Sequence, residues 1–238
     1  DLQSGKIDII IGTHALIQND VNYANLGLVV TDEQHRFGVN QRENLKNKGI
    51  MPDVLYMSAT PIPRTFALTI YGDMDISIIK EMPKGRLPVE TFVKSNEQIT
   101  DVLEMMLEEL NNKHQIYVIA PLIEDSENSD LTSVNELRDK MNLAFGKKYK
   151  IDLLHGKIGN NQKDEIMKNF KDGKTHILIS TTVIEVGVDV PNASMMVIFD
   201  ANRFGLSTLH QLRGRVGRGS VASKCVLISS QETKRLEI

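Results

Sequence analysis

Short hydrophobic runs, bounded by turn-forming residues, recur along this chain with longer amphipathic stretches between them. The runs cover residues 7–11, 26–30, 54–57, 116–120, 151–154, 176–179 and 195–199. Several of them are apolar at every position, which is typical of strands covered on both faces of a sheet. The pattern therefore predicts a mostly parallel sheet buried between helices.

The stretches between the runs show helical spacing. Apolar residues recur at i, i+3, i+4 and i+7 through the segment 99–110, which indicates an amphipathic helix. A second helix is expected to begin at Ser133, because Ser133 and Glu136 have the spacing of a capping box. Since strands and helices alternate, the predicted fold class is α/β.

One stretch interrupts this alternation. Residues 82–88 hold two prolines and a glycine, and a new strand signal starts at Val89. We therefore predict two domains, residues 1–85 and residues 86–238. The first is small for a parallel α/β domain, has no initiator Met and starts almost at once with a hydrophobic run. We expect it to be the later part of a larger domain.

Composition narrows the class of protein. Of the 238 residues, 41% are hydrophobic and 25% are charged, which excludes collagen-like and wholly disordered chains. The formal net charge of -3 gives no general attraction to nucleic acid, so such binding needs a local basic patch. The single cysteine, Cys225, cannot form an internal disulfide, and we expect a reducing, cytoplasmic location without a disulfide-linked partner. No apolar run approaches the roughly 18 residues of a membrane span, so no membrane partner is expected.

The first candidate chemistry is a pair of carboxylates. Asp32 and Glu33 follow a predicted strand, at the edge of the sheet where ligands bind in open α/β folds. An aspartate there suits a divalent metal that bridges phosphates, and a glutamate suits the orientation of an attacking water. By itself the pair is more commonly a solvated turn. Because His35 has no second His or Cys at ligand spacing, a zinc site is not expected.

Hydroxyl-bearing segments follow two other predicted strands. Ser58 and Thr60 come after the run 54–57, at the same edge as Asp32, although alone they fit the start of a capped helix. A later segment follows the run 176–179 and offers hydroxyls, a glycine and an acid, which suit contacts to a nucleic-acid backbone and a nucleotide. Its candidate residues are Thr181, Thr182, Gly187 and Asp189. That segment alone also fits an ordinary loop between a strand and a helix.

A basic segment lies near the end of the chain. Residues 201–231 hold no Asp or Glu but five Lys and Arg residues. A helix that turns about 100° per residue brings Gln211, Arg215 and Arg218 into one stripe, where the arginines form a fork for phosphate oxygens. Two glycines inside that helix would weaken it, so we infer that something approaches its backbone closely. A solvated basic helix is the alternative.

Taken together, these segments resemble the motor core of superfamily 2 helicases in kind and order. Longer strings are similar to the RecG family of that superfamily: DEQHRFGV at 32–39, ATPIPRT at 59–65, VIEVGVDVPNAS at 183–194 and LHQLRGRVGRG at 209–219. The resemblance extends over nearly the whole chain. It implies two RecA-like lobes with mostly parallel sheets, the first lobe incomplete. It also implies an ATP-dependent DNA helicase or translocase that remodels branched DNA, such as stalled forks and Holliday junctions.

The resemblance assigns a role to each candidate residue. Asp32 would hold magnesium together with ATP, and Glu33 would position the hydrolytic water. Three residues would stabilise the transferring phosphoryl group across the cleft between the lobes: Gln211, Arg215 and Arg218. The other candidates would lie beside the nucleotide (Gly187 and Asp189), contact the DNA backbone (Thr13, Thr181 and Thr182) or couple the two sites (Ser58 and Thr60).

The sequence departs from the helicase pattern at one point. No phosphate loop of the form GxxxxGK[ST] occurs in it. The family has this loop, and a DNA-binding wedge domain, upstream of the segment that starts at Gly12, and we expect both to lie before Asp1. We therefore predict a piece of the motor that by itself neither hydrolyses ATP nor unwinds DNA. The alternatives are a transcription-repair coupling translocase and a non-catalytic nucleic-acid-binding module.

Overall fold

The computed structural model describes residues 1–33, 44, 47–58, 75–79, 81, 85–121, 129–181 and 189–229. The chain divides into two compact units, Asp1–Asp75 (unit 1) and Ile76–Ile238 (unit 2). Three of the predicted site residues lie outside the described residues: Thr60, Thr182 and Gly187.

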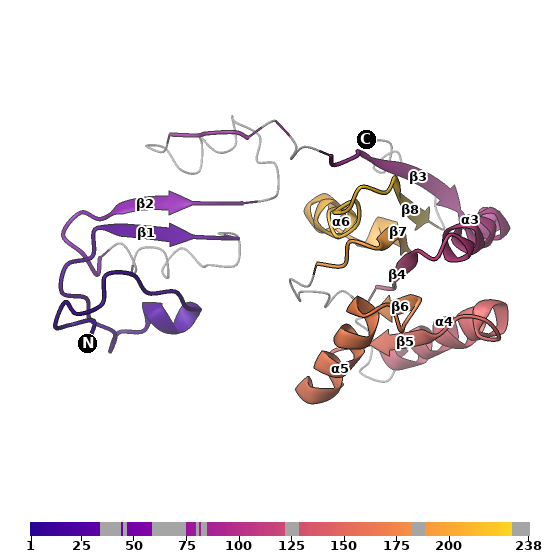
Figure 1. Cartoon of the computed structure of the whole chain (residues 1–238), viewed down its shortest axis with the longest axis horizontal. Helices are drawn as coiled ribbons and strands as arrows, with labels where there is room; N and C mark the ends of the chain where they lie inside the picture. The colour runs from indigo at the N-terminus through magenta and orange to yellow at the C-terminus, as the bar shows by residue number, and fades with distance from the viewer. Residues whose placement is uncertain are drawn as a thin grey trace. The chain divides into compact units, whose positions relative to one another are not determined.

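Unit 1 contains a small parallel sheet. A 3-10 helix, η1 (His14–Ile17), precedes strands β1 (Leu28–Thr31) and β2 (Asp53–Tyr56), which pair in parallel (Figure 1). Both strands fall where hydrophobic runs predicted them. Alternate residues of β1 are exposed and buried, so the described part of this sheet is covered on one face only.

The strand predicted at residues 7–11 is wrong. This segment has no regular structure, and the side chains of Ile9 and Ile11 are 82% and 93% exposed. A strand is stabilised by a ladder of hydrogen bonds to a neighbour, and no described segment pairs with this one. Its isoleucines therefore have a high strand propensity, but the segment has no described neighbour with which to form a strand.

Unit 2 is built on a six-stranded sheet in which every pair of neighbours is parallel. The strand order is β3-β8-β7-β4-β6-β5. The strands are β3 (Val89–Ser95), β4 (Gln115–Ile119), β5 (Ile151–Leu154), β6 (Ile177–Ser180), β7 (Ala193–Ile198) and β8 (Ser223–Ser229). The parallel α/β architecture predicted from the sequence is confirmed.

Helices connect these strands. They are η3 (Asn96–Gln98), α3 (Ile99–Asn111), α4 (Ser129–Phe145), α5 (Asn160–Lys171), η4 (Ala201–Arg203) and α6 (Leu206–Arg213). The amphipathic helix predicted at 99–110 is α3. The predicted start of the next helix at Ser133 is wrong, because α4 begins four residues earlier, at Ser129. A Ser and a Glu three residues apart also fit a helix interior, so the spacing alone does not mark the first turn.

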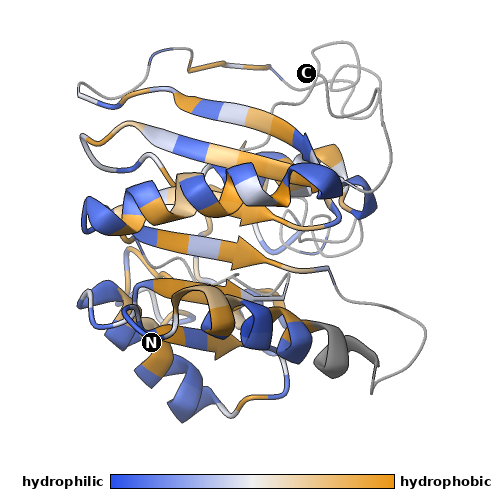
Figure 2. Cartoon of the chain, turned by 90° about the vertical axis from the view of Figure 1, so that its right-hand side faces the viewer, coloured by the Kyte–Doolittle hydropathy of each residue, from blue (hydrophilic) through white to orange (hydrophobic). Residues whose placement is uncertain are grey.

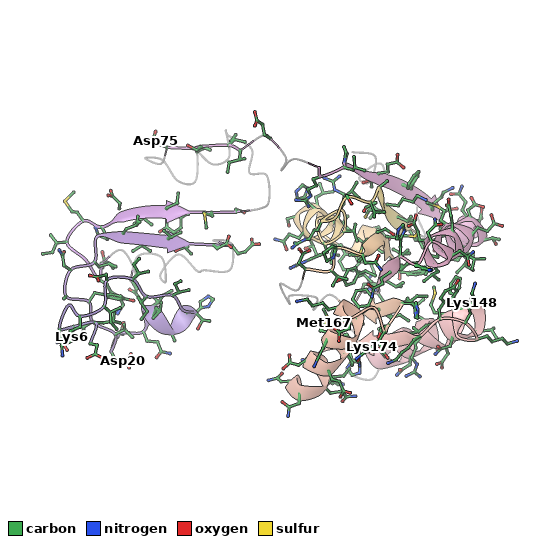
Figure 3. All side chains as sticks on the ribbon, viewed as in Figure 1. Lys6, Asp20, Asp75, Lys148, Met167 and Lys174 are labelled. Atoms are coloured by element: carbon green, nitrogen blue, oxygen red, sulfur yellow. The ribbon has the colours of Figure 1, made fainter. Side chains whose placement is uncertain are left out.

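Two hydrophobic cores lie on opposite faces of the sheet of unit 2. Alternate residues of β4 enter different cores: Tyr117 and Ile119 pack with residues of α5 and α6, and Ile116 and Val118 pack with residues of α3 and α4. Met167 of α5, labelled in Figure 3, is only 4% exposed. Figure 2 shows the inner strands as largely hydrophobic, while the helices are of mixed hydropathy. The sheet is therefore the middle of three layers, as fully apolar strands predict.

No helix in the described ranges combines the length and the apolar character that crossing a bilayer requires.

Candidate functional site

The carboxyl ends of β1 and β2 bring two candidate segments to one edge of the sheet in unit 1. Thr31 is the register partner of Tyr56, and the Met57 amide donates a hydrogen bond of 2.8 Å to the Thr31 carbonyl. Asp32 is the first residue after β1, and Ser58 is the second after β2. The structure therefore places Asp32, Glu33 and Ser58 at the same sheet edge, in agreement with the predicted arrangement.

The two carboxylates differ in environment. Asp32 is exposed, and its Oδ1 accepts a hydrogen bond of 2.8 Å from the Glu33 amide. Glu33 is half-buried and has a φ of 51°, in the left-handed region that few non-glycine residues adopt. The turn after β1 thus leaves Asp32 exposed to water and Glu33 partly buried.

Asp32 suits one particular mode of metal binding. No group of three or more His, Cys, Asp or Glu is arranged to hold a metal in the part of the chain that the structure describes. Magnesium is commonly bound through one or two carboxylates, with phosphate oxygens and waters as the remaining ligands. An exposed aspartate at this edge fits that mode, in which a nucleotide supplies part of the coordination.

Thr13 lies elsewhere in unit 1. It is exposed and precedes η1, where its carbonyl accepts a hydrogen bond of 3.0 Å from the Leu16 amide. Its side chain makes no capping hydrogen bond to the helix. Thr13 is thus the N-cap residue of η1 through its backbone only, and its hydroxyl takes no part in capping.

The basic segment of unit 2 is not one continuous helix, so the predicted stripe is wrong. Helix α6 ends at Arg213 with Gly214 as its C-cap, and Gly217 has a φ of +71°, outside the range of a right-handed helix. Gln211 lies within α6, whereas Arg215 and Arg218 belong to the turn that follows. We name residues 214–219 the arginine turn.

The arginine turn is fixed by its apolar and glycine residues. Val216, between the two arginines, is fully buried in the core that contains Tyr117. A Cβ atom on Gly217 would lie 2.6 Å from Val89 Cγ2, and one on Gly219 would lie 2.7 Å from the Pro191 carbonyl. These close approaches explain the glycines better than a contact with a bound ligand would.

Three charged side chains act electrostatically on one buried tyrosine, Tyr117. Burial raises the pKa of the Tyr117 hydroxyl to about 12, while the charges of Arg215 and Arg218 oppose the rise and that of Asp189 adds to it. Arg218 Nε donates a hydrogen bond of 3.1 Å to the Gly214 carbonyl and lies 3.9 Å from Asp189 Oδ1. Such an exposed ion pair is weak, so Arg218 remains available to a stronger anion.

Two polar side chains lie at the carboxyl ends of β5 and β6. Thr181 follows β6 and is 2% exposed, and its amide donates to the Leu154 carbonyl at 3.3 Å. Its Oγ1 and the Nδ1 of His155, which follows β5, are buried, and neither has a hydrogen-bond partner among the residues that the structure describes. Burial, then the charges of Lys163 and Lys157, lower the pKa of His155 and favour its neutral form. A buried hydroxyl without a partner is costly, so this edge favours binding of a polar group.

Sequence reasoning missed two residues beside these sites, His155 and Arg86. His155 directly follows a predicted strand, and that position is the signal by which it could have been found. Arg86 Nε donates a hydrogen bond of 2.9 Å to the carbonyl of Gly217, which is 131 residues away along the chain. No local pattern in the sequence indicates that contact.

Two helicase family models match the chain. Residues 97–220 match the helicase conserved C-terminal domain, and residues 1–68 match the DEAD/DEAH box helicase. Since the first match covers more than half of the chain, the chain belongs to the family of the helicase conserved C-terminal domain.

Within that class, the chain is similar to RecG proteins. It is 56% identical over 234 residues to the ATP-dependent DNA helicase RecG of Staphylococcus epidermidis, covering 98% of this chain and 34% of that protein. It is 55% identical over 232 residues to RecG of Streptococcus pneumoniae, covering 98% and 35%. The resemblance to RecG is confirmed, and the chain spans about a third of the length of these relatives.

Solved structures of helicases are also similar to this chain. A structure of RecG bound to a three-way DNA junction is 45% identical, with a TM-score of 0.74 over 99% of this chain and 30% of that one. Dbp5 of S. cerevisiae, bound to RNA and ADP BeF3, is 18% identical, with a TM-score of 0.59 over 92% of this chain and 57% of that one. The second likeness supports the fold alone. The predicted RecA-like α/β fold is confirmed.

Proposed function

We propose that this chain is part of the motor of an ATP-dependent DNA helicase or translocase that remodels branched DNA, such as stalled forks and Holliday junctions. The arginine turn is the observation on which the proposal depends most. Arg218 lies there 3.9 Å from Asp189, and Arg215 and Arg218 both act electrostatically on the buried Tyr117, on a fold shared with helicases. The RecG relatives and the RecG structure on a DNA junction support branched DNA as the partner.

The carboxylates of unit 1 would serve the nucleotide. Bound ATP with magnesium would supply the phosphoryl group whose transfer to water drives the motor. Asp32 would hold the magnesium, because its carboxylate is exposed at a sheet edge. Glu33 is half-buried beside it and would orient the attacking water.

The residues of unit 2 would act on the same nucleotide. Arg215 and Arg218 would offset negative charge on the transferring phosphoryl group, a contact worth roughly a factor of 10³ to 10⁵ in rate. Gln211, one turn earlier on α6, would contribute a polar contact. Asp189, within 3.9 Å of Arg218, and Gly187 would lie beside the nucleotide.

A separate set of residues would contact DNA. Thr181 has a buried hydroxyl at the carboxyl end of β6 with no hydrogen-bond partner in the described part of the chain, which supports a contact with a phosphate oxygen there. Thr13 and Thr182 would make similar contacts, and Ser58 and Thr60 would couple them to the nucleotide. Contacts of this kind position the DNA backbone without reading its sequence.

The chain would be inactive by itself. None of its 238 residues forms a GxxxxGK[ST] loop, so the backbone amides and lysine that hold a triphosphate would have to come from elsewhere in a longer protein. Coverage of about a third of the RecG relatives supports a wedge domain and a first part of the first lobe outside this sequence. Residues 1–85 and 86–238 would be the two lobe segments, in the cytoplasm.

The test is ATP turnover of the full-length gene product with Arg215→Ala or Arg218→Ala, with and without a model DNA fork. Each variant should lose roughly 10³-fold in turnover while its affinity for the fork stays within about threefold of the wild type. Arg138→Ala is the matched control, because Arg138 is a half-buried arginine paired with Asp139 on α4.

The outcomes are distinct. Near-normal turnover in both arginine variants would remove these residues from the catalytic assignment. The 238-residue chain, assayed alongside, should show no DNA-stimulated turnover, and turnover near that of the full-length protein would contradict its proposed inactivity. The similarity to proteins named RecG favours this function over a transcription-repair coupling translocase.

A further inference from the structure

A residue outside the arginine turn, Arg86, forms a hydrogen bond to the backbone of the turn and has no proposed role in the nucleotide chemistry. Arg86 precedes β3 and is half-buried, and its Nε donates a hydrogen bond of 2.9 Å to the carbonyl of Gly217. Donor and acceptor are 131 residues apart along the chain, yet both belong to unit 2. The contact therefore joins the segment that enters unit 2 to the turn that bears Arg218.

This hydrogen bond controls one particular peptide group. The Gly217 carbonyl belongs to the planar unit that joins Gly217 to Arg218, so fixing its oxygen fixes the plane from which Arg218 continues. Gly217 has a φ of +71°, and glycine reaches many other backbone conformations at little cost. An external contact is thus needed to select one orientation of this plane.

A second contact, from a residue three positions after Arg86, restricts the conformation of the arginine turn further. Val89, at the start of β3, has its Cγ2 only 2.6 Å from the place that a Cβ on Gly217 would occupy. Arg86 and Val89 are three residues apart and reach the turn together, one through a hydrogen bond and one through packing. On the other side of Gly217, the buried side chain of Val216 anchors the turn to the core.

We propose that Arg86 is a positioning residue for Arg218. It holds the Gly217–Arg218 peptide in the orientation that presents the Arg218 guanidinium to phosphate, and it acts only through Gly217. The inference rests on the proposed function for Arg218. It adds that the segment before β3 is part of the machinery that sets the rate of ATP turnover.

The first measurement tests the positioning directly, without any activity. Amide hydrogen exchange of residues 214–219 is compared in the full-length wild type, Arg86→Ala, Arg86→Lys and the control Arg138→Ala. Exchange in the arginine turn should rise at least tenfold in Arg86→Ala, partly recover in Arg86→Lys and stay unchanged in Arg138→Ala. The melting temperature of each variant shows whether the fold is intact.

The second measurement is steady-state ATP turnover of the same four proteins with a model DNA fork. A misplaced arginine should lower kcat roughly 10- to 100-fold and leave KM for ATP within about threefold. Arg86→Lys keeps a charged donor and should restore part of kcat. A variant that is merely less stable would lose active protein without this recovery, and its loss would track its melting temperature.

Each outcome decides between two ideas. Faster exchange in the turn together with a lower kcat, both partly restored by lysine, supports the proposal. Unchanged exchange in Arg86→Ala overturns it. So does normal kcat in Arg86→Ala when Arg218→Ala has lost turnover, and that result leaves the proposed function standing. Normal turnover in Arg215→Ala and Arg218→Ala would instead remove the proposed function and this inference with it.

Discussion

Glu109 is a buried carboxylate with partners from three parts of unit 2. Its Oε2 accepts a hydrogen bond of 2.5 Å from Ser194 Oγ of β7 and lies 2.7 Å from Nδ1 of His114, while its Oε1 lies 3.0 Å from Lys224 Nζ of β8. Burial by itself raises the pKa of Glu109, but these hydrogen bonds and the charge of Lys224 outweigh burial and hold it below its ordinary value. The carboxylate thus ties α3 to two strands.

Glu109→Gln should lower the free energy of unfolding of unit 2 by about 2 kcal/mol at pH 7, because it removes one charge of a buried pair. Glu108→Gln is the matched control, since Glu108 is exposed and contacts the same Lys224 at 3.2 Å. That change should cost less than about 0.5 kcal/mol. Urea unfolding of both variants measures the difference, and equal losses would contradict the role of burial.

The pH dependence of this difference follows from the two pKa shifts. A carboxylate with a lowered pKa stabilises the fold above its ordinary pKa of 4.5, and that contribution is lost as the pH falls through the folded value. The pKa of Lys224 is raised, because its contacts with Glu109 and Glu108 outweigh burial, so its contribution is lost as the pH rises above 10.5. The effect of Glu109→Gln should therefore be greatest between these values.

Single residues differ in how far their positions follow from the sequence. The placement of Asp32 and Ser58 was predictable, because parallel neighbouring strands end at the same edge of a sheet. The contact between Arg86 and Gly217 was not, because it spans 131 residues and depends on tertiary packing. Local sequence patterns predict the position of a residue that follows its own strand. They do not predict contacts with a segment far away in the sequence.

At the scale of elements, the turn after α6 shows how a helical period misleads. Spacing alone extends the helix to Arg218, but Gly214 and Gly217 end it by C-capping and by a positive φ. The sequence predicts close approach of another group to Gly214 and Gly217 within a helix. Close approach is present at Gly217, where a Cβ would meet Val89 Cγ2 at 2.6 Å, but in a turn, whereas a Cβ on Gly214 would meet only backbone oxygens of the preceding turn at 3.5 Å.

Gly217→Ala tests how tightly this turn is packed. The alanine would meet a strained φ and also Val89 Cγ2 at 2.6 Å, so we expect a loss of about 2 to 3 kcal/mol in stability. Gly173→Ala is the control, because Gly173 has a φ of +73° and open space around it. It should cost about 1 kcal/mol, the backbone term alone.

The double variant Gly217→Ala with Val89→Ala separates packing from strain in the same turn. It should be less destabilised than the sum of the two single changes, because removing the valine methyls makes room for the new Cβ. Thermal or urea unfolding of the wild type, the two single variants and the double variant gives the coupling. Strict additivity would show that Val89 does not press on the turn.

The strands show the same limits as the turn. Inner strands such as β4 and β7 were predictable, because both of their faces are apolar. The edge strand β3 has only exposed and half-buried residues, yet its start at Val89 was predicted, whereas β8 starts with Ser223 and Lys224 and was not identified as a strand. Residues 7–11 have strand propensity, but no described strand pairs with them. Whether such a segment forms a strand thus depends more on a neighbouring strand with which it can pair than on its composition.

For the whole molecule, the two units differ in how much apolar surface they bury. In the described part of unit 1 the buried hydrophobic residues are Ile17 and Val29, whereas Leu28, Val30 and Leu55 on its sheet are 51 to 61% exposed. Unit 2 has hydrophobic cores on both faces of a six-stranded sheet. A two-stranded sheet is marginal in water, so we expect unit 1 of this chain to be much the less stable.

Hydrogen exchange of the purified 238-residue chain tests this difference. Amides of β4, β6 and β7 should be protected at least 100-fold more than those of β1 and β2, and limited proteolysis should cut first before residue 76. The inner strands of unit 2 act as the internal control. Equal protection in both sheets, with one cooperative unfolding transition, would contradict the expectation.

The strand order of unit 2 also affects how this unit can fold while the ribosome synthesises it. The neighbour of β3 in the described sheet is β8, which is the last strand of that sheet to be synthesised. At bacterial-like rates of about 5 to 20 residues per second, β3 leaves the ribosome on the order of ten seconds before its neighbour exists. Throughout that interval its row of amides and carbonyls has no native partner. During synthesis, β3 must therefore avoid pairing with strands of other proteins until β8 is available.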